Sequence, residues 1–149
     1  MPAEQKRAGT IAHATLNDVA LLTALAGLVV IEYNKIAHKG THFVSAHAIL
    51  GLITYLLILI QAVVGATQYF IPQLYGGVDN AKKLYKYHRV GGYLIFLLLL
   101  ATVAAATQTD FNKNVLGIQL WAVIVAAIIT LVGVVPRVRL AKFGWLAGQ

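Results

Sequence analysis

Long stretches without charge limit what this chain can fold into more than any other feature. No Asp, Glu, Lys or Arg occurs between Lys39 and Asp79, between Arg89 and Asp110, or between Lys113 and Arg137. A fourth apolar stretch, residues 11–35, contains two charged residues, Asp18 and Glu32, before it ends at Lys35. A helix needs about 20 mostly apolar residues to cross a hydrocarbon core of roughly 30 Å. The sequence therefore predicts four membrane-spanning helices, at about residues 11–35, 43–71, 84–108 and 115–135.

A soluble four-helix bundle is the alternative fold, and it would need a polar face on each helix. The runs at residues 94–103 and 121–135 offer almost no polar side chain. The segments between the predicted helices are short, so neighbouring helices must run in opposite directions. The predicted fold class is all-α, a membrane-spanning antiparallel four-helix bundle, forming a single domain over residues 1–149.

Composition narrows the function further. The chain contains no cysteine, which excludes disulfides, thiolate metal sites and cysteine nucleophiles. Its net charge of +7 is not a nucleic-acid signal, because the basic residues lie at the ends of the apolar runs and form no stripe. We therefore expect the lipid bilayer as a partner and no nucleic acid.

The basic residues also predict an orientation. One side of the membrane would hold both termini and the segment 73–83, and the other side the segments 36–42 and 109–114. Basic residues favour the cytosolic side of membrane proteins. Both termini are therefore predicted to be cytosolic in a multi-pass protein of an endomembrane or the plasma membrane. The first side carries nine basic residues, and the second carries Lys35, Lys39 and Lys113; the nine are Lys6, Arg7, Lys82, Lys83, Lys86, Arg89, Arg137, Arg139 and Lys142.

Three histidines lie about one turn inside the ends of predicted spans: His13, His47 and His88. Ionisable residues within membrane helices are candidates for function. His13 and His88 belong to helices that run in the same direction, so they should lie at similar depth. Two imidazoles facing each other across a bundle can hold a six-coordinate haem, which carries electrons and has no open position for oxygen. Zinc fits less well, because His47 belongs to the opposite side.

Glycines follow two of these histidines at the same spacing. Gly51 comes four residues after His47, and Gly92 comes four residues after His88. Residues four apart share a helix face, so a missing side chain there would leave room for a porphyrin edge. The alternative readings are that the glycines are packing points between helices and that the histidines extend towards the membrane surface.

At these residues the chain resembles the cytochrome b561 family of transmembrane di-haem electron carriers, especially the eukaryotic members that consist of the b561 domain alone. The resemblance runs from about His13 to Val135. It rests on three groups of residues: His42, Ser45, His47, Gly51, Gln61, Gly65 and Pro72; Tyr87, His88 and Gly92; and His13 with Tyr33, Asn34, Lys35, His38, Lys39 and Gly40.

The resemblance implies haem b as the cofactor, with His13 and His88 as iron ligands on the cytosolic side and His47 as a ligand of a second haem. It implies ascorbate or another small reductant as the donor, and an oxidoreductase that reduces monodehydroascorbate or ferric iron. By the same resemblance the basic residues Lys6 and Arg7, in a zone shared with Lys82 and Lys83, bind ascorbate; membrane anchoring is an equal alternative for each. His38 resembles the family's histidine near the exoplasmic substrate site, although His42 is also nearby.

The chain departs from the family in one respect. The family takes the partner of His47 from a helix that precedes the His13 helix, and this sequence starts shortly before that helix. We therefore expect an N-terminally shortened member with one complete bis-histidine site and one half-site, which a homodimer could complete. His42 is too close to His47 in sequence to sandwich a ring with it.

Two other functions remain open from the sequence. One is a haem-free membrane interaction protein or subunit anchor. The other is a small transporter in which Asp18 and the histidines relay protons.

Overall fold

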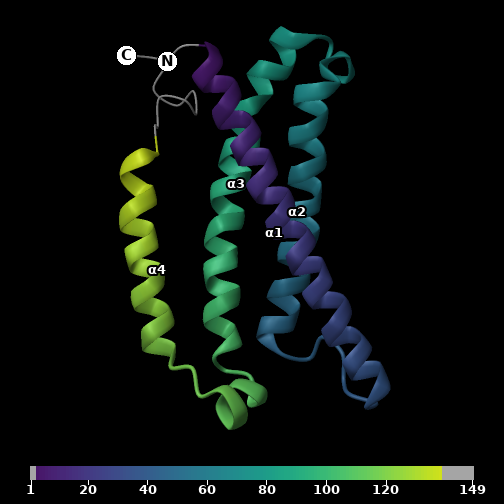
Figure 1. The fold of residues 1–149 in the computed structure, drawn as a ribbon, viewed down its shortest axis with the longest axis vertical. Helices are drawn as coiled ribbons and strands as arrows, with labels where there is room; N and C mark the ends of the chain where they lie inside the picture. The colour runs from purple at the N-terminus through teal and green to yellow at the C-terminus, as the bar shows by residue number, and fades with distance from the viewer. Residues whose placement is uncertain (1–2, 139–149) are drawn as a thin grey trace. The chain divides into compact units, whose positions relative to one another are not determined.

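Four long helices make up almost all of the structure, a computed structural model that describes residues 3–138. They are α1 (Ala3–Ala37), α2 (Ala46–Phe70), α3 (Val78–Ala106) and α4 (Leu120–Val134), and no strand occurs among the described residues (Figure 1). Each helix, α4 together with its last turn to Arg137, is long and apolar enough to cross a membrane. The predicted all-α, membrane-spanning four-helix fold is confirmed.

The chain divides into two compact units, Met1–His42 and Phe43–Gln149. The first unit consists of α1 and the few residues that follow it. The helix begins at Ala3, well before the predicted start at residue 11. Hydropathy locates only the apolar part of a helix, and the residues before it, such as Glu4, Gln5, Lys6 and Arg7, are themselves good helix formers.

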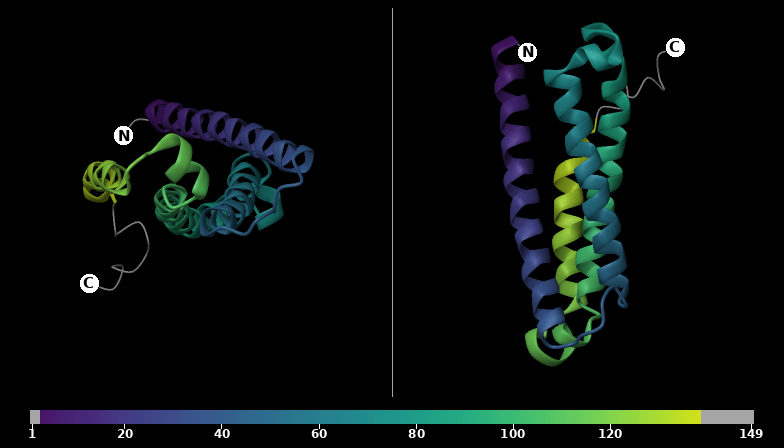
Figure 2. Two further views of the ribbon diagram at one scale, coloured as in Figure 1. Left: turned by 90° about the horizontal axis from the view of Figure 1, so that it is seen from below. Right: turned by 90° about the vertical axis from the view of Figure 1, so that its right-hand side faces the viewer.

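In the second unit, α2 and α3 form an antiparallel pair, and α4 runs antiparallel beside α3 (Figure 2). Ser45 caps the start of α2, because its hydroxyl accepts a hydrogen bond from the Ala48 amide at 3.1 Å. Pro72 ends the helix and opens a short turn over Pro72–Tyr75. Gly76 then adopts a φ of 78°, which residues with a side chain rarely tolerate, and α3 starts at Val78, six residues before the predicted position.

Two threonines meet at the α2–α3 interface, towards the end of the pair where α2 begins and α3 ends. The hydroxyl oxygens of Thr54 and Thr102 lie 3.3 Å apart, and the two side chains are 3% and 7% exposed. Each threonine also contacts the carbonyl four residues before it on its own helix. The register is antiparallel: Gly51 lies opposite Thr102, and Gly65 lies opposite His88.

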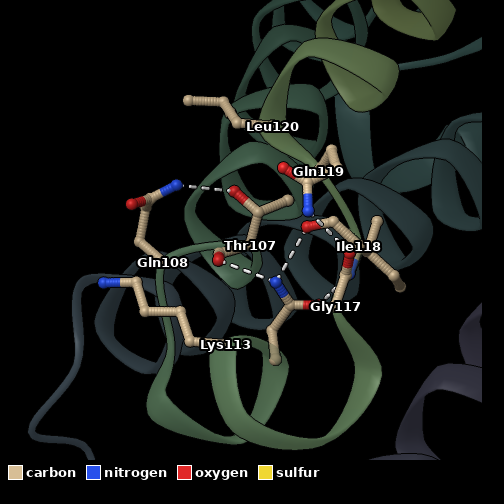
Figure 3. Close-up of a pocket in the computed structure, with 8 residues that line it drawn as sticks. Thr107, Gln108, Lys113, Gly117, Ile118, Gln119 and Leu120 are labelled. Carbon is tan, nitrogen blue, oxygen red and sulfur yellow. Dashed lines mark hydrogen bonds between the residues drawn. The ribbon is translucent and has the colours of Figure 1, made fainter.

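The connection from α3 to α4 is built around Asn112. Its amide donates to the carbonyls of Thr107 at 2.8 Å and Ile118 at 2.9 Å, and its oxygen accepts from the Ile118 amide at 3.2 Å (Figure 3). Val115 and Leu116 belong to a single wide turn, Asn112–Leu116, which Gly117 ends with a φ of 66°. For this reason α4 begins at Leu120 and not at residue 115 as predicted.

Candidate functional site

His47 is held through its own ring. It lies in the first turn of α2, half-buried, and its Nδ1 is 3.0 Å from the main-chain oxygen of Thr102 on α3. A carbonyl only accepts hydrogen bonds, so Nδ1 carries a proton, and the neutral form of the ring has its lone pair at Nε2. Histidines that bind metals are usually held in this way, with the second nitrogen donating to a carbonyl or carboxylate. His47 therefore has the donor chemistry of an iron ligand.

His88 is held through its surroundings. It lies on α3, half-buried, with its ring against Gly65 of α2. A Cβ atom at position 65 would be 2.8 Å from Cε1 of His88 and 3.3 Å from Nε2, too close for the ring to stay where it is. The side-chain amide of Gln61, one turn before Gly65, donates a hydrogen bond to the main-chain oxygen of His88.

A glycine of α3, Gly91, allows Gln61 to reach His88. A Cβ atom at Gly91 of α3 would be 3.0 Å from the Gln61 amide nitrogen and 3.3 Å from its oxygen. Contacts shorter than about this distance are unfavourable, so a side chain at 91 would displace the amide. Gln61 and Gly65 contact His88 from α2, and Gly91 of α3 leaves room for the Gln61 amide; we refer to these three residues as the His88 cradle.

The two glycines singled out by their spacing have a different role. A Cβ atom at Gly51 would be 3.8 Å from the Thr102 methyl group, and one at Gly92 would be 3.6 Å from the Gln61 amide. The nearest neighbour of each glycine is thus on the opposite helix, at an ordinary contact distance. This supports the alternative that they are packing points between helices, and room for a porphyrin edge beside them stays a prediction.

A cavity of about 270 Å³ adjoins His88. Gln68, which is 4% exposed, contributes to its wall, and the Gln68 Oε1 is buried with no hydrogen-bond partner among the described residues. A buried acceptor of this kind marks a place for a donor from water or a ligand. An apolar and aromatic wall with a few amides is typical of sites for organic cofactors, so the residues present fit a haem edge. The lining residues are Gln61, Val64, Gln68, Tyr75, Leu84, Tyr87 and His88.

His13 lies on α1, in the first unit, and is exposed. The amide nitrogen of Asn17, one turn later, is 3.1 Å from Nδ1 of His13 and donates to its main-chain oxygen at 2.7 Å. Asn17 thus holds both the ring and the backbone of this histidine. The pairing of His13 with His88 stays a prediction, because it joins the two units.

The predicted substrate-binding lysines and arginine are exposed. Lys82 lies 3.7 Å from Asp79, and Lys83 donates to the Asn80 side chain at 3.2 Å, both within the first turns of α3. Ion pairs at such exposed positions hold their side chains weakly, so the ammonium groups remain accessible to an anion. Lys6 and Arg7 are exposed in the first turns of α1. Arg139 and Lys142 lie outside the described residues.

The loop histidines form contacts of their own in the first unit. The ring of His38 donates from Nδ1 to the Asn34 carbonyl at 2.9 Å. Nδ1 of His42 contacts the Glu32 carboxylate, whose other oxygen is 3.9 Å from Nζ of Lys35. Nothing in the sequence connects His42 with Glu32, because they are ten residues apart and a turn lies between them.

The sequence alone does not indicate a role for the His88 cradle or for Gln68. Gln61 and Gly65 are named only among the residues that carry the family resemblance. The four-residue spacing of Gln61 and Gly65 was available as a signal, but only the antiparallel register places that face against His88.

Comparison with known proteins gives one match. The model of a family described as eukaryotic cytochrome b561 matches residues 1–113, a range that includes α1, α2 and α3. No curated protein and no solved structure matches the chain.

Proposed function

Because this chain belongs to the eukaryotic cytochrome b561 family, we propose that it carries electrons across a membrane, from cytosolic ascorbate towards monodehydroascorbate or ferric iron. The family and the four candidate spans make the chain an integral membrane protein of the haem-dependent electron-transfer type. The donor, the acceptor, the ligands and the orientation belong to the proposal.

One observation carries the proposal: the two histidines of the α2–α3 pair lie near opposite ends of it. His47 is in the first turn of α2, whereas His88 faces Gly65 of the same helix. Position 65 is 18 residues further along, which corresponds to roughly 27 Å of helix axis. Since a bilayer core is roughly 30 Å thick, the two imidazoles are placed to serve redox centres near the two surfaces.

We propose that His13 and His88 would hold a haem iron on the cytosolic side. Bound haem b supplies one-electron chemistry between ferric and ferrous iron. Two imidazoles leave no open coordination position, which favours electron transfer over oxygen chemistry. His88 would contribute its imidazole from a cavity wall that is largely apolar and aromatic. Asn17 contacts the ring of His13.

His47 is the ligand we assign to the second site. Its Nδ1–H donates to the Thr102 carbonyl, which leaves Nε2 for a metal. The proposal thus has one bis-histidine site, at His13 and His88, and a second site at which His47 is the one assigned ligand. A homodimer is an arrangement in which a second copy of the chain would supply an imidazole beside His47.

The basic side chains act on the reductant. Lys6, Arg7, Lys82 and Lys83 are exposed and belong to the side with the larger number of basic residues, which we assign to the cytosol together with both termini. Clustered positive charge raises the local concentration of an anion such as ascorbate and speeds its encounter with the protein. On the opposite side, we assign His38 to the region where the acceptor binds, in an endomembrane or the plasma membrane.

The test is a dithionite-reduced minus oxidised spectrum of the purified protein in detergent, with haem counted per chain. One haem per chain that is lost in His13→Ala and in His88→Ala, but kept in His47→Ala, is the expected result. Two haems per chain would show that His47 has a partner. A spectrum without a Soret band would overturn the proposal in favour of a haem-free membrane interaction protein or subunit anchor.

A further inference from the structure

Two residues one turn apart on α2 meet the same residue of α3. Gln61 donates its side-chain amide to the main-chain oxygen of His88, and Gly65 lies under the imidazole ring. Both contacts come from one face of α2, because residues four apart share a face. The backbone and the ring of His88 are therefore positioned by the same stretch of the neighbouring helix.

The distances show what would move if this stretch changed. The nearest atoms to a Cβ at position 65 are Cε1, Nε2 and Nδ1 of His88, at 2.8, 3.3 and 3.6 Å, and all belong to the ring. The backbone of α2 is fixed by its own hydrogen bonds, whereas the ring can rotate about its side-chain bonds. A methyl group at position 65 would consequently displace the imidazole and leave the helices in place.

Gly91 acts on His88 through Gln61. A Cβ at position 91 would be 3.0 Å from the Gln61 nitrogen that donates to His88. Gly92, the next residue, leaves 3.6 Å to the same nitrogen, which is an ordinary contact. Two adjacent glycines on α3 thus differ in their effect on one hydrogen bond, and this difference provides a matched control.

We propose that Gln61, Gly65 and Gly91 are positioning residues that set the orientation of the His88 imidazole as an axial ligand. This inference rests on the proposed haem-binding function. The groups around a metal ligand orient it and tune the metal, and their loss typically lowers metal affinity about 10–100-fold. The cradle would therefore control haem affinity and reduction potential through the orientation of the His88 ring, and Gln61 also lines the cavity beside that ring.

The experiment compares five single variants of the full chain, purified in detergent with haem. Gly65→Ala, Gly91→Ala and Gln61→Met alter the cradle; Gly51→Ala and Gly92→Ala are the controls. The readouts are haem affinity, the low-spin ferric EPR signal and the midpoint potential, with circular dichroism and thermal unfolding to follow the fold. Methionine at 61 keeps the length of the glutamine but cannot donate a hydrogen bond.

Gly65→Ala is expected to weaken haem binding about 10–100-fold and to convert low-spin into high-spin signal, with helical content unchanged. Added imidazole should restore the low-spin signal by replacing the displaced ring. Gly91→Ala and Gln61→Met should shift the midpoint potential in the same direction as each other and weaken haem binding less than Gly65→Ala does. Both controls should match the wild type.

Wild-type spectra and potentials in both Gly65→Ala and Gln61→Met would overturn the inference, while the haem in the wild type would leave the proposed function intact. Gln61→Met decides the matter if Gly65→Ala does not fold. A wild-type chain without haem would overturn the proposed function instead. In that case nitrogen-15 NMR of labelled histidine in the apoprotein tests the cradle: Gly65→Ala should move the His88 resonance and Gly51→Ala should not, and an unmoved resonance would refute ring positioning.

Discussion

The two ends of the α2–α3 pair each present a histidine, but they hold it by different means. At one end the His47 ring makes its own hydrogen bond to the Thr102 carbonyl. At the other end the backbone of His88 is held by Gln61, and its ring rests against Gly65. Each histidine is followed by a glycine four residues later, and the nearest neighbour of each glycine is a side chain of the opposite helix. Equal spacing in the sequence therefore does not imply equal surroundings in the structure.

This difference determines which end is more sensitive to its neighbours. The hydrogen bond of His47 goes to a main-chain atom, which no single side-chain substitution removes. His88 is contacted by one side-chain amide, and its ring lies where position 65 carries no side chain; Gly91 in turn leaves room for that amide. We expect substitutions around His88 to affect its ring, and substitutions around His47 to affect mainly the stability of the helix pair.

The largest expected effect separates the two histidines themselves. His88→Ala should abolish haem binding at the complete site, because a bis-histidine site loses an axial ligand, and His13→Ala should do the same. His47→Ala should keep that haem. Haem per chain from a pyridine haemochrome spectrum measures the outcome.

His38→Ala is the control for this comparison, because its ring lies in the loop after α1 and bonds to the Asn34 carbonyl nearby. It should keep the wild-type haem content. Loss of haem in His47→Ala with retention in His88→Ala would reverse the roles of the two ends.

The next expected effect is confined to the His47 end and concerns the cap of α2. Ser45→Ala removes the hydroxyl that accepts a hydrogen bond from the Ala48 amide. Ser45 lies two residues before His47, and Ala48 directly follows it. Losing such a cap costs about 1 kcal/mol of helix stability. Denaturant or thermal unfolding in detergent should show this loss.

The haem spectrum is the internal control for Ser45→Ala and should remain that of the wild type, because the cradle is at the other end of the pair. Ser45→Asp, which retains a capping oxygen, should recover most of the stability. An unchanged stability in Ser45→Ala would show that water or lipid headgroups replace the cap.

The contrast between the two ends also shows what sequence can and cannot reveal. Uncharged runs predicted α2 and α3, because an apolar run of that length has few stable alternatives in a membrane. Their ends were less accurate: α3 starts six residues early because Gly76 and Gly77, and not the first apolar residue, end the preceding turn. Val115 and Leu116 are apolar but fall outside α4, because Asn112 draws them into a turn.

The candidate site divides in the same way. The sequence indicated His13, His47 and His88 because an ionisable residue in a membrane helix is energetically costly and is therefore a candidate for function. It did not indicate the cradle, because that depends on which residues of α2 lie opposite His88, and the register is a property of the packed pair. The same holds for Gly51 and Gly92: the sequence shows that they lack a side chain but not which residue of the opposite helix lies nearest.

A smaller effect is expected where Thr54 and Thr102 meet at 3.3 Å, towards the His47 end of the pair. Hydrogen bonds between membrane helices contribute about 0.6 kcal/mol on average and at most about 1.7 kcal/mol. A double-mutant cycle of Thr54→Val and Thr102→Val should yield a coupling energy in this range, measured by unfolding in detergent. Valine keeps the size and shape of threonine, so packing changes little.

The same cycle tests whether the two ends are independent. The midpoint potential and haem content of the double variant should match the wild type, because neither hydroxyl contacts the cradle. A shift in potential as large as that of Gln61→Met would mean that the helix pair moves as a unit. The surroundings of His47 and His88 would then not be independent of each other.

The smallest expected effect concerns the basic residues at the His88 end. Replacing Lys82 and Lys83 by glutamine should slow haem reduction by ascorbate a few-fold at low salt, because positive charge near the site attracts the anion. The difference should vanish above about 0.5 M salt, where the Debye length falls to a few ångströms. Stability should hardly change, because both side chains are exposed and their contacts with Asp79 and Asn80 are weak. Lys113→Gln is the matched control, since Lys113 belongs to the loop between α3 and α4, at the end of α3 away from Lys82 and Lys83. Equal slowing in Lys113→Gln would mean that net charge alone attracts the reductant, and an unchanged rate in the Lys82/Lys83 variant would leave these lysines with membrane anchoring as their role.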